Sequence, residues 1–269
     1  MEFLIACDLE GIHGVVGLPY ETLTATPDYA KAVEGAILEI NTVTRTLFEN
    51  GATKVAVWDN HGGGENIDFS KLDSRIIRVT NKGCEYRYDF VKEHDFKAII
   101  YLGYHAKEGE PGGVLAHSYN SKAIQYIKLD NKAVGELSVD TLICKLNGIT
   151  PILCATDDVA LKEITELCNG ITTVVTKIGK GRNSAVLKDR DEVLSELEKA
   201  TITALNKPEP SIGFNFKDSY HLEIRYTRAE KAGERLAQAL EKGIPASYGE
   251  DTHIVHYTID NLKLIPKFL

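Results

Sequence analysis

The stretch FLIACDLEG, residues 3–11, combines a short apolar run with two carboxylates at its end. Five apolar residues in succession have the length and character of a buried strand. Asp8 and Glu10 are two positions apart, so both carboxylates leave the same face while the chain stays extended. Gly11 and two further glycines then allow the chain to turn back. The stretch therefore predicts a strand that ends at a pair of carboxylates.

Segments of strand length alternate with segments of helical periodicity along most of the chain. Between residues 28 and 50, apolar residues recur at helical spacing, and the pattern stops at Asn50-Gly51. Further strands are expected at residues 54–58, 76–79, 98–102, 151–155 and 172–176, and a hairpin at residues 124–134. Further helices are expected at residues 85–94, 137–147, 157–168 and 191–205. This alternation predicts an α/β fold: a doubly wound, mostly parallel sheet with helices on both faces.

The pattern breaks at Lys207-Pro208-Glu209-Pro210, where two prolines interrupt the helical spacing. Beyond this point the chain has strand-like segments at residues 211–216, 221–226 and 252–259, and helical spacing at residues 229–242. We therefore expect an α/β domain over residues 1–206 and a smaller α+β unit over residues 211–269.

Acidic and imidazole side chains occur where the predicted strands end. His61 follows the second strand and precedes three glycines, which let the backbone pass close to a ligand. His105 ends a later apolar run, and Glu136 follows the return arm of the predicted hairpin. Because ligands bind where the carboxyl ends of parallel strands converge, we expect these three side chains to meet Asp8 and Glu10 in one crevice.

Each of these residues also has an ordinary structural explanation. Asp8 and Glu10 would cap the following turn, His105 would be a hydrogen-bonded core histidine, and Glu136 would complement the dipole of a helix start. The functional interpretation therefore rests on the five residues occurring together, since no single one of them requires it. Three carboxylates and two imidazoles exceed the ligands of one tetrahedral zinc, and they suit two metal ions that share a bridging carboxylate.

If residues 107–113 form a loop that leads away from the sheet and back, His117 is expected to lie at the same crevice. An imidazole there that binds no metal would act as a general acid, a general base or an oxyanion stabiliser. Alternatively, His117-Ser118 is the core of a metal-free nucleophilic site, although the spacing shows no acidic residue that would orient the histidine. Asp59 is expected to orient His61 or to cap its turn.

Composition narrows the class of protein. The 269-residue chain is 43% hydrophobic and 26% charged, with a formal net charge of -8. An acidic balance argues against a nucleic-acid partner, since such proteins usually carry a basic face. No apolar stretch approaches the ~18 residues of a membrane span, and no signal peptide is visible at the amino terminus. The sequence therefore predicts a cytoplasmic protein with no nucleic-acid or membrane partner.

At these residues the chain resembles the zinc-dependent D-aminopeptidases of bacteria and archaea, a small family of metallopeptidases. The matching segments are residues 8–12, 59–61, 102–106, 117–118 and 134–137, with weaker matches at residues 157–158 and 182–185. The resemblance covers roughly residues 1–190 in order.

The resemblance implies a dinuclear zinc site with two Zn²⁺ per subunit. The family's metal ligands fall on Asp8, Glu10, His61, His105 and Glu136, and its proposed catalytic histidine falls on His117. The implied activity is removal of N-terminal residues, notably D-amino acids, from short peptides by zinc-activated water. The implied assembly is a ring-like homo-oligomer, a decamer, that encloses the sites.

Two other functions remain open from the sequence. A magnesium-dependent phosphatase of the haloacid dehalogenase type would use Asp8 as nucleophile and the pair Asp157-Asp158 to hold Mg²⁺; it leaves the three histidines unexplained. A non-enzymatic, metal-binding oligomer is the other alternative. The Gly- and Lys-rich residues 177–183 lack the spacing of a phosphate-binding loop, so we expect a solvated turn or an oligomer contact with a substrate-facing Arg182 or Asn183.

Overall fold

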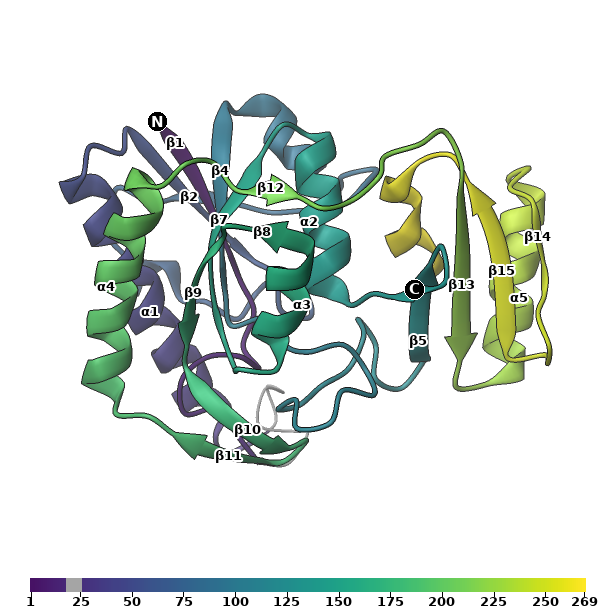
Figure 1. Ribbon diagram of the computed structural model, residues 1–269, viewed down its shortest axis with the longest axis horizontal. Coiled ribbons are helices and arrows are strands. Elements are labelled where there is room, and N and C mark those ends of the chain that lie inside the picture. Colours follow the sequence, from purple (N-terminus) through teal and green to yellow (C-terminus); the bar gives the residue numbers. More distant parts are fainter. Residues whose placement is uncertain (18–25) are drawn as a thin grey trace.

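The computed structural model describes residues 1–17 and 26–269. Its larger part is a six-stranded sheet in the order β3-β2-β1-β4-β7-β9, in which every neighbouring pair is parallel (Figure 1). The strands are β1 (Glu2–Cys7), β2 (Lys54–Asp59), β3 (Ile77–Val79), β4 (Phe96–Leu102), β7 (Thr150–Thr156) and β9 (Thr172–Val175). The inner strand β1 is the one expected from residues 3–11.

Helices cover both faces of this sheet. On one face, α1 (Tyr29–Glu49) packs against α4 (Arg190–Asn206); on the other, α2 (Glu136–Leu146) packs against α3 (Ala160–Leu167) (Figure 1). Side chains of β1 alternate between the two layers, with Ile5 facing α1 and Leu4 facing α2 in separate apolar cores. The predicted α/β fold with a doubly wound, mostly parallel sheet and helices on both faces is confirmed.

A second, antiparallel sheet lies beside α2, in the order β14-β15-β13-β5-β6 (Figure 1). Its strands are β5 (Ile124–Leu129), β6 (Lys132–Ala133), β13 (Tyr220–Tyr226), β14 (Ala246–Tyr248) and β15 (Ile254–Ile259), and it is flanked by α5 (Ala229–Glu241) and the 3₁₀ helix η3 (Leu262–Phe268). The hairpin β5–β6 comes from the first half of the chain, and one apolar core joins this sheet to α2. The division into domains at residues 206–211 stays a prediction.

The remaining elements are short. A 3₁₀ helix η1 (Phe69–Lys71) precedes β3. The strand β8 (Cys168–Asn169) pairs with β12 (Ser211–Ile212). Of the strand expected at residues 211–216, only the two residues of β12 are in a strand. Where a helix was expected at residues 85–94, the structure has only the 3₁₀ helix η2 (Asp89–Glu93).

The expected loop at residues 177–183 is wrong. These residues belong to a β-hairpin, in which β10 (Lys177–Gly181) pairs with β11 (Ser184–Leu187) across a two-residue connection. Gly179 serves close packing, because a Cβ there would collide with the carbonyl oxygen of Gly112.

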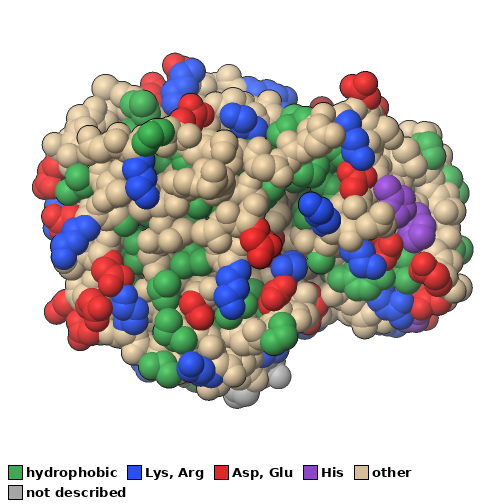
Figure 2. All heavy atoms as spheres, viewed as in Figure 1, with side chains coloured by type: hydrophobic (Ala, Val, Ile, Leu, Met, Phe, Trp, Pro, Cys, Tyr) green, Lys and Arg blue, Asp and Glu red, His purple; other side chains and the backbone are tan. Residues whose placement is uncertain are grey.

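Acidic and basic side chains intermingle over the face shown in Figure 2, without a broad patch of one sign. Within residues 1–17 and 26–269, no helix has the length and apolar character needed to span a membrane.

Candidate metal centre

The register of the parallel sheet brings the predicted site residues to one edge. Cys7, the last residue of β1, lies opposite Asp59 of β2 on one side and Leu102 of β4 on the other, so the three strands end level. Asp8 and His61 therefore leave the sheet at nearly the same height. His105 joins them from the chain that continues β4.

Asp8 and Glu10 form the first half of the cluster, together with His61. The Nδ1 of His61 lies 2.8 Å from Asp8 Oδ1 and 3.3 Å from Glu10 Oε2. Both carboxylates are almost completely buried, at 3% and 4% exposure. Two carboxylates held away from water need a compensating positive charge close by.

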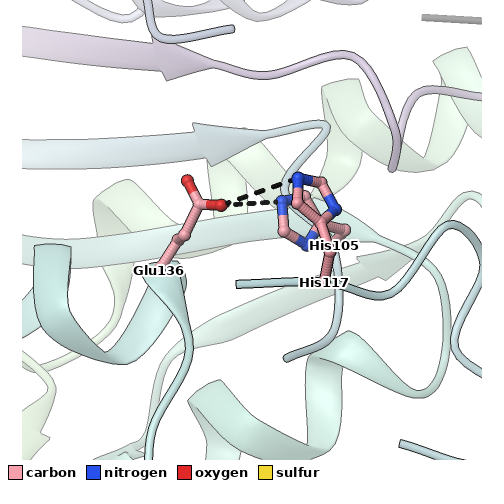
Figure 3. A group of neighbouring side chains, drawn as sticks. All are labelled: His105, His117 and Glu136. Carbon is pink, nitrogen blue, oxygen red and sulfur yellow. Dashed lines mark ion pairs between the residues drawn. The ribbon is translucent and has the colours of Figure 1, made fainter. Parts of the chain in front are cut away.

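Glu136 and two stacked imidazoles form the second half. Glu136 Oε1 lies 3.1 Å from His105 Nε2 and 3.9 Å from His117 Nε2, and both rings turn a nitrogen toward this oxygen (Figure 3). The rings of His105 and His117 stack with centroids 3.8 Å apart. The backbone N–H of Tyr119 donates to the same Oε1 at 2.6 Å, which orients the Glu136 carboxylate.

His105 belongs to both halves. Its Nε2 is 3.6 Å from Asp8 Oδ2 as well as 3.1 Å from Glu136 Oε1. The possible ligand atoms of Asp8, Glu10 and His105 lie within 4.8 Å of one another, and so do those of His105, His117 and Glu136. The structure thus brings together all five predicted ligands and His117. Oxygen and imidazole donors at this spacing fit divalent ions such as zinc.

The charges of the cluster are interdependent. Burial and the neighbouring Glu10 raise the pKa of Asp8 to about 7. Burial alone would lower the pKa of His61, but the Glu10 and Asp8 carboxylates raise it to about 12. Burial likewise opposes protonation of His105, yet Glu136 raises its pKa to about 10. The carboxylates therefore attract positive charge strongly, and metal ions bound here would displace these protons.

Two glycines let the ends of β1 and β4 approach closely. A Cβ at Gly11 would collide with the carbonyl oxygen of Tyr104, and one at Gly103 would collide with that of Asp8. Gly103 also has a positive φ of 70°, which side chains disfavour. The backbones that carry Asp8 and His105 are thus in direct contact.

Lys177 stabilises the turn after Glu10 through hydrogen bonds to its backbone. It is fully buried, and its Nζ donates to the carbonyl oxygens of Glu10 at 2.5 Å and Ile12 at 2.7 Å. The expectation of a solvated turn at this position is wrong for Lys177, because its backbone lies in β10 and its side chain points into the domain.

Glu163 fixes the start of the helix that carries Glu136. The helix is preceded by Gly135, which has no side chain to cap the first turn. Instead Glu163 Oε1, from α3, accepts the backbone N–H groups of Gly135 at 2.8 Å and Ser138 at 3.3 Å.

A cavity of about 280 Å³ opens beside the cluster. Its lining includes all predicted site residues except His105, and further consists of Asn60, Gly62, Leu115, Tyr119, Asn120, Ser121, Lys122 and Arg182. Arg182 is tied to the loop of His117: its Nη1 donates to the carbonyl oxygen of Ala116, and its own carbonyl accepts the N–H of Leu115 at 2.7 Å.

The other acidic residues singled out from the sequence have structural roles. Asp59 does not orient the His61 ring; its carboxylate accepts the backbone N–H groups of Asn66 and Ile67 and so caps the turn. Asp157 caps the start of α3 through the N–H groups of Val159 and Ala160.

The fold and the cluster define an α/β protein with a carboxylate–imidazole site suited to divalent metal ions. The sequence model of the D-aminopeptidase family matches residues 1–260, and the chain belongs to this family.

A protein sequence and a solved structure, both from Bacillus subtilis, are similar to the chain. A D-aminopeptidase of strain 168 is 27% identical over 179 residues, which are 66% of this chain and 64% of the relative. The match thus spans less than two thirds of that relative's length. A solved structure, described as a zinc-dependent D-aminopeptidase and self-compartmentalizing protease, has a TM-score of 0.85 at 24% identity, covering 98% of this chain and 93% of the other. This likeness supports the same fold.

Proposed function

We propose that this chain is a zinc-dependent aminopeptidase that removes N-terminal residues, preferentially D-amino acids, from short peptides. The observation that carries the proposal is the shared position of His105 between two groups of ligand atoms, each gathered within 4.8 Å. Family membership and the names of the similar Bacillus subtilis sequence and structure support the same activity.

Asp8, Glu10, His61, His105 and Glu136 would hold two zinc ions, and the Asp8 carboxylate contacts the imidazoles of both His61 and His105. Zinc at such a site supplies Lewis acidity and lowers the pKa of water toward neutrality. Carboxylates of the cluster would also pair with the α-ammonium group of a peptide, which would select substrates with a free amino terminus.

His117 would transfer the proton. Its Nδ1 lies 2.9 Å from the carbonyl oxygen of Leu115, so this nitrogen is the donor and the neutral ring leaves Nε2 unprotonated. Burial and the nearby His105 lower the pKa of His117, which keeps Nε2 able to accept a proton from the attacking water. The protonated ring would then donate to the leaving amine.

The phosphatase alternative is not favoured. Asp157 and Asp158 would have to hold Mg²⁺ beside Asp8, but Asp157 caps α3 and Asp158 Oδ1 accepts the N–H of Gly179 at 2.7 Å. Neither Asp157 nor Asp158 is among the described residues that line the cavity. A purely structural metal role is also disfavoured, because the cluster opens onto a cavity with room for a ligand.

The activity is tested with two dipeptides that differ only in the configuration of the first residue, D-Ala-Ala and L-Ala-Ala. We expect zinc-dependent release of the first residue, faster for the D-form, and no cleavage of an N-acetylated control. Equal cleavage of the acetylated peptide would contradict an aminopeptidase, and faster cleavage of the L-form would remove the D-preference alone.

Among the described residues, the cavity is lined by two cationic side chains, Lys122 and Arg182, and we expect them to bind the terminal carboxylate of a short peptide. Hydrogen bonds to charged groups contribute about 1.5–3 kcal/mol, so Arg182→Gln should raise the KM of a free dipeptide about tenfold or more. The KM of the corresponding dipeptide amide should change little. Arg45→Gln, at an exposed ion pair with Glu198, is the control. An equal rise in KM for both substrates would contradict carboxylate binding.

We also propose a homo-oligomer, since the similar solved structure is described as self-compartmentalizing. The decameric ring implied by the family resemblance is tested by light scattering of the purified protein. A cytoplasmic location stays a prediction from the sequence.

A further inference from the structure

An ion pair between a largely buried arginine and a fully buried aspartate lies near the cluster and is not required by the proposed chemistry. Arg87 donates from Nε to Asp140 Oδ1 at 2.5 Å and from Nη2 to Asp140 Oδ2 at 2.8 Å. Asp140 is fully buried. It lies on α2 four residues after Glu136, so the two carboxylates leave the same side of the helix one turn apart.

The pair belongs to a closed ring of hydrogen bonds. Arg87 Nη2 donates to Asn60 Oδ1 at 2.6 Å, Asn60 Nδ2 donates to the hydroxyl of Tyr104 at 2.9 Å, and that hydroxyl donates to Asp140 Oδ2 at 2.7 Å. The hydroxyl of Tyr88 donates to the same Oδ2 at 3.1 Å. Every heteroatom of the Asp140 carboxylate is thus engaged, as a buried charge requires.

Three of the four members of the ring lie on a segment that carries a proposed ligand. Asn60 immediately precedes His61, Tyr104 immediately precedes His105, and Asp140 shares α2 with Glu136. The ring therefore connects three segments that are far apart in the sequence and that each carry one ligand. The Arg87 guanidinium also lies over the aromatic ring of Tyr119, 5.3 Å from its centroid. The backbone N–H of Tyr119 in turn donates to Glu136.

A buried ion pair is a poor source of stability, because desolvation offsets the attraction and apolar residues of similar volume often stabilise as well. The presence of this pair is better explained by the directed bonds that it makes. We propose that Arg87 and Asp140 are positioning residues that set the spacing of His61, His105 and Glu136 for metal binding. This inference rests on the proposed function.

The test is the double variant Arg87→Met/Asp140→Leu, which removes both charges and keeps an apolar filling. Zinc affinity is measured by competition with a chelating dye, so the readout does not depend on activity, and thermal unfolding of the metal-free protein is measured in parallel. Loss of a direct partner of a metal ligand typically changes affinity 10- to 100-fold. Because Arg87 and Asp140 act through Asn60, Tyr104 and α2, we expect a loss of about 10-fold, with a modest fall in Tm as the Tyr88 and Tyr104 hydroxyls lose Asp140.

The matched control is Lys128→Met/Glu223→Leu, which removes a partly buried ion pair of 2.8 Å between β5 and β13, in the second sheet. This control should bind zinc as the wild type does. A second variant, Tyr104→Phe, opens the hydrogen-bonded ring at one hydroxyl while it keeps the aromatic ring, and it should also weaken zinc binding. It serves as the test if the double variant does not fold.

The outcomes separate the two proposals. Wild-type zinc affinity in a folded double variant, or in Tyr104→Phe, would overturn the positioning role and leave the aminopeptidase proposal intact. A wild-type protein that binds no zinc would instead remove the proposed function, and the inference with it. Weaker zinc binding in the variants with an unchanged Lys128/Glu223 control supports the positioning role.

Discussion

Replacement of Asp8 by Asn is expected to abolish zinc-dependent peptide hydrolysis and to remove most of the bound metal. Asp8 contacts His61 at 2.8 Å and His105 at 3.6 Å, so its carboxylate lies beside both imidazoles that would hold zinc. Changes to outer-sphere partners already cost about 10–100-fold in metal affinity, and loss of a ligand should exceed this. Zinc per chain and zinc affinity, measured on the purified variant, check the prediction.

The control for this variant is Glu223→Gln on β13, a buried carboxylate that pairs with Lys128 outside the cluster. It should keep its zinc and its activity. Full zinc occupancy in Asp8→Asn at wild-type affinity would show that Asp8 is not a ligand.

Replacement of His117 by Ala should leave zinc binding intact while turnover falls. General acid–base catalysis contributes typically 10²–10⁴-fold, and a loss of about that size in kcat is expected with little change in KM. The prediction separates two roles that the geometry allows, because His117 Nε2 also lies among the atoms able to hold an ion with His105 and Glu136.

His221→Ala is the matched histidine control, since His221 lies on β13 in the second sheet, outside the cluster, and should change neither property. Loss of zinc from His117→Ala would make His117 a ligand. Unchanged turnover with unchanged zinc would exclude it from catalysis.

The sheet was predictable because its strands carry local signals. The run at residues 3–7 and the later apolar segments are bounded by polar or glycine residues, and the helix over residues 29–49 has apolar residues at regular spacing. The hairpin at residues 177–187 was missed because its glycines and lysines are typical of a solvated turn. What makes it a hairpin is non-local: the approach of Gly179 to Gly112 and of Lys177 to Glu10.

The gathering of the site residues followed from one rule, that parallel strands end at a common edge. It applied to Asp8, His61 and His105, which follow three adjacent strands. The position of His117 depended on the path of residues 107–113, and the structure does return it to a stacked contact with His105.

The ring behind the cluster was not anticipated. Asp140 carried a weak signal, since it lies four residues after Glu136 on the same helix. Arg87 carried none, because it lies in an irregular segment and meets Asp140 and Asn60 only through the tertiary fold. Buried polar networks of this kind depend on contacts between distant segments and are therefore hard to find in one sequence.

The most direct test of the account is elemental analysis of the purified protein, combined with peptide hydrolysis before and after chelation. The account predicts about two zinc-like ions per chain, activity lost with the metal, and activity restored when zinc is returned. A protein free of transition metal that hydrolyses peptides unchanged, or that instead releases phosphate with Mg²⁺, would contradict it.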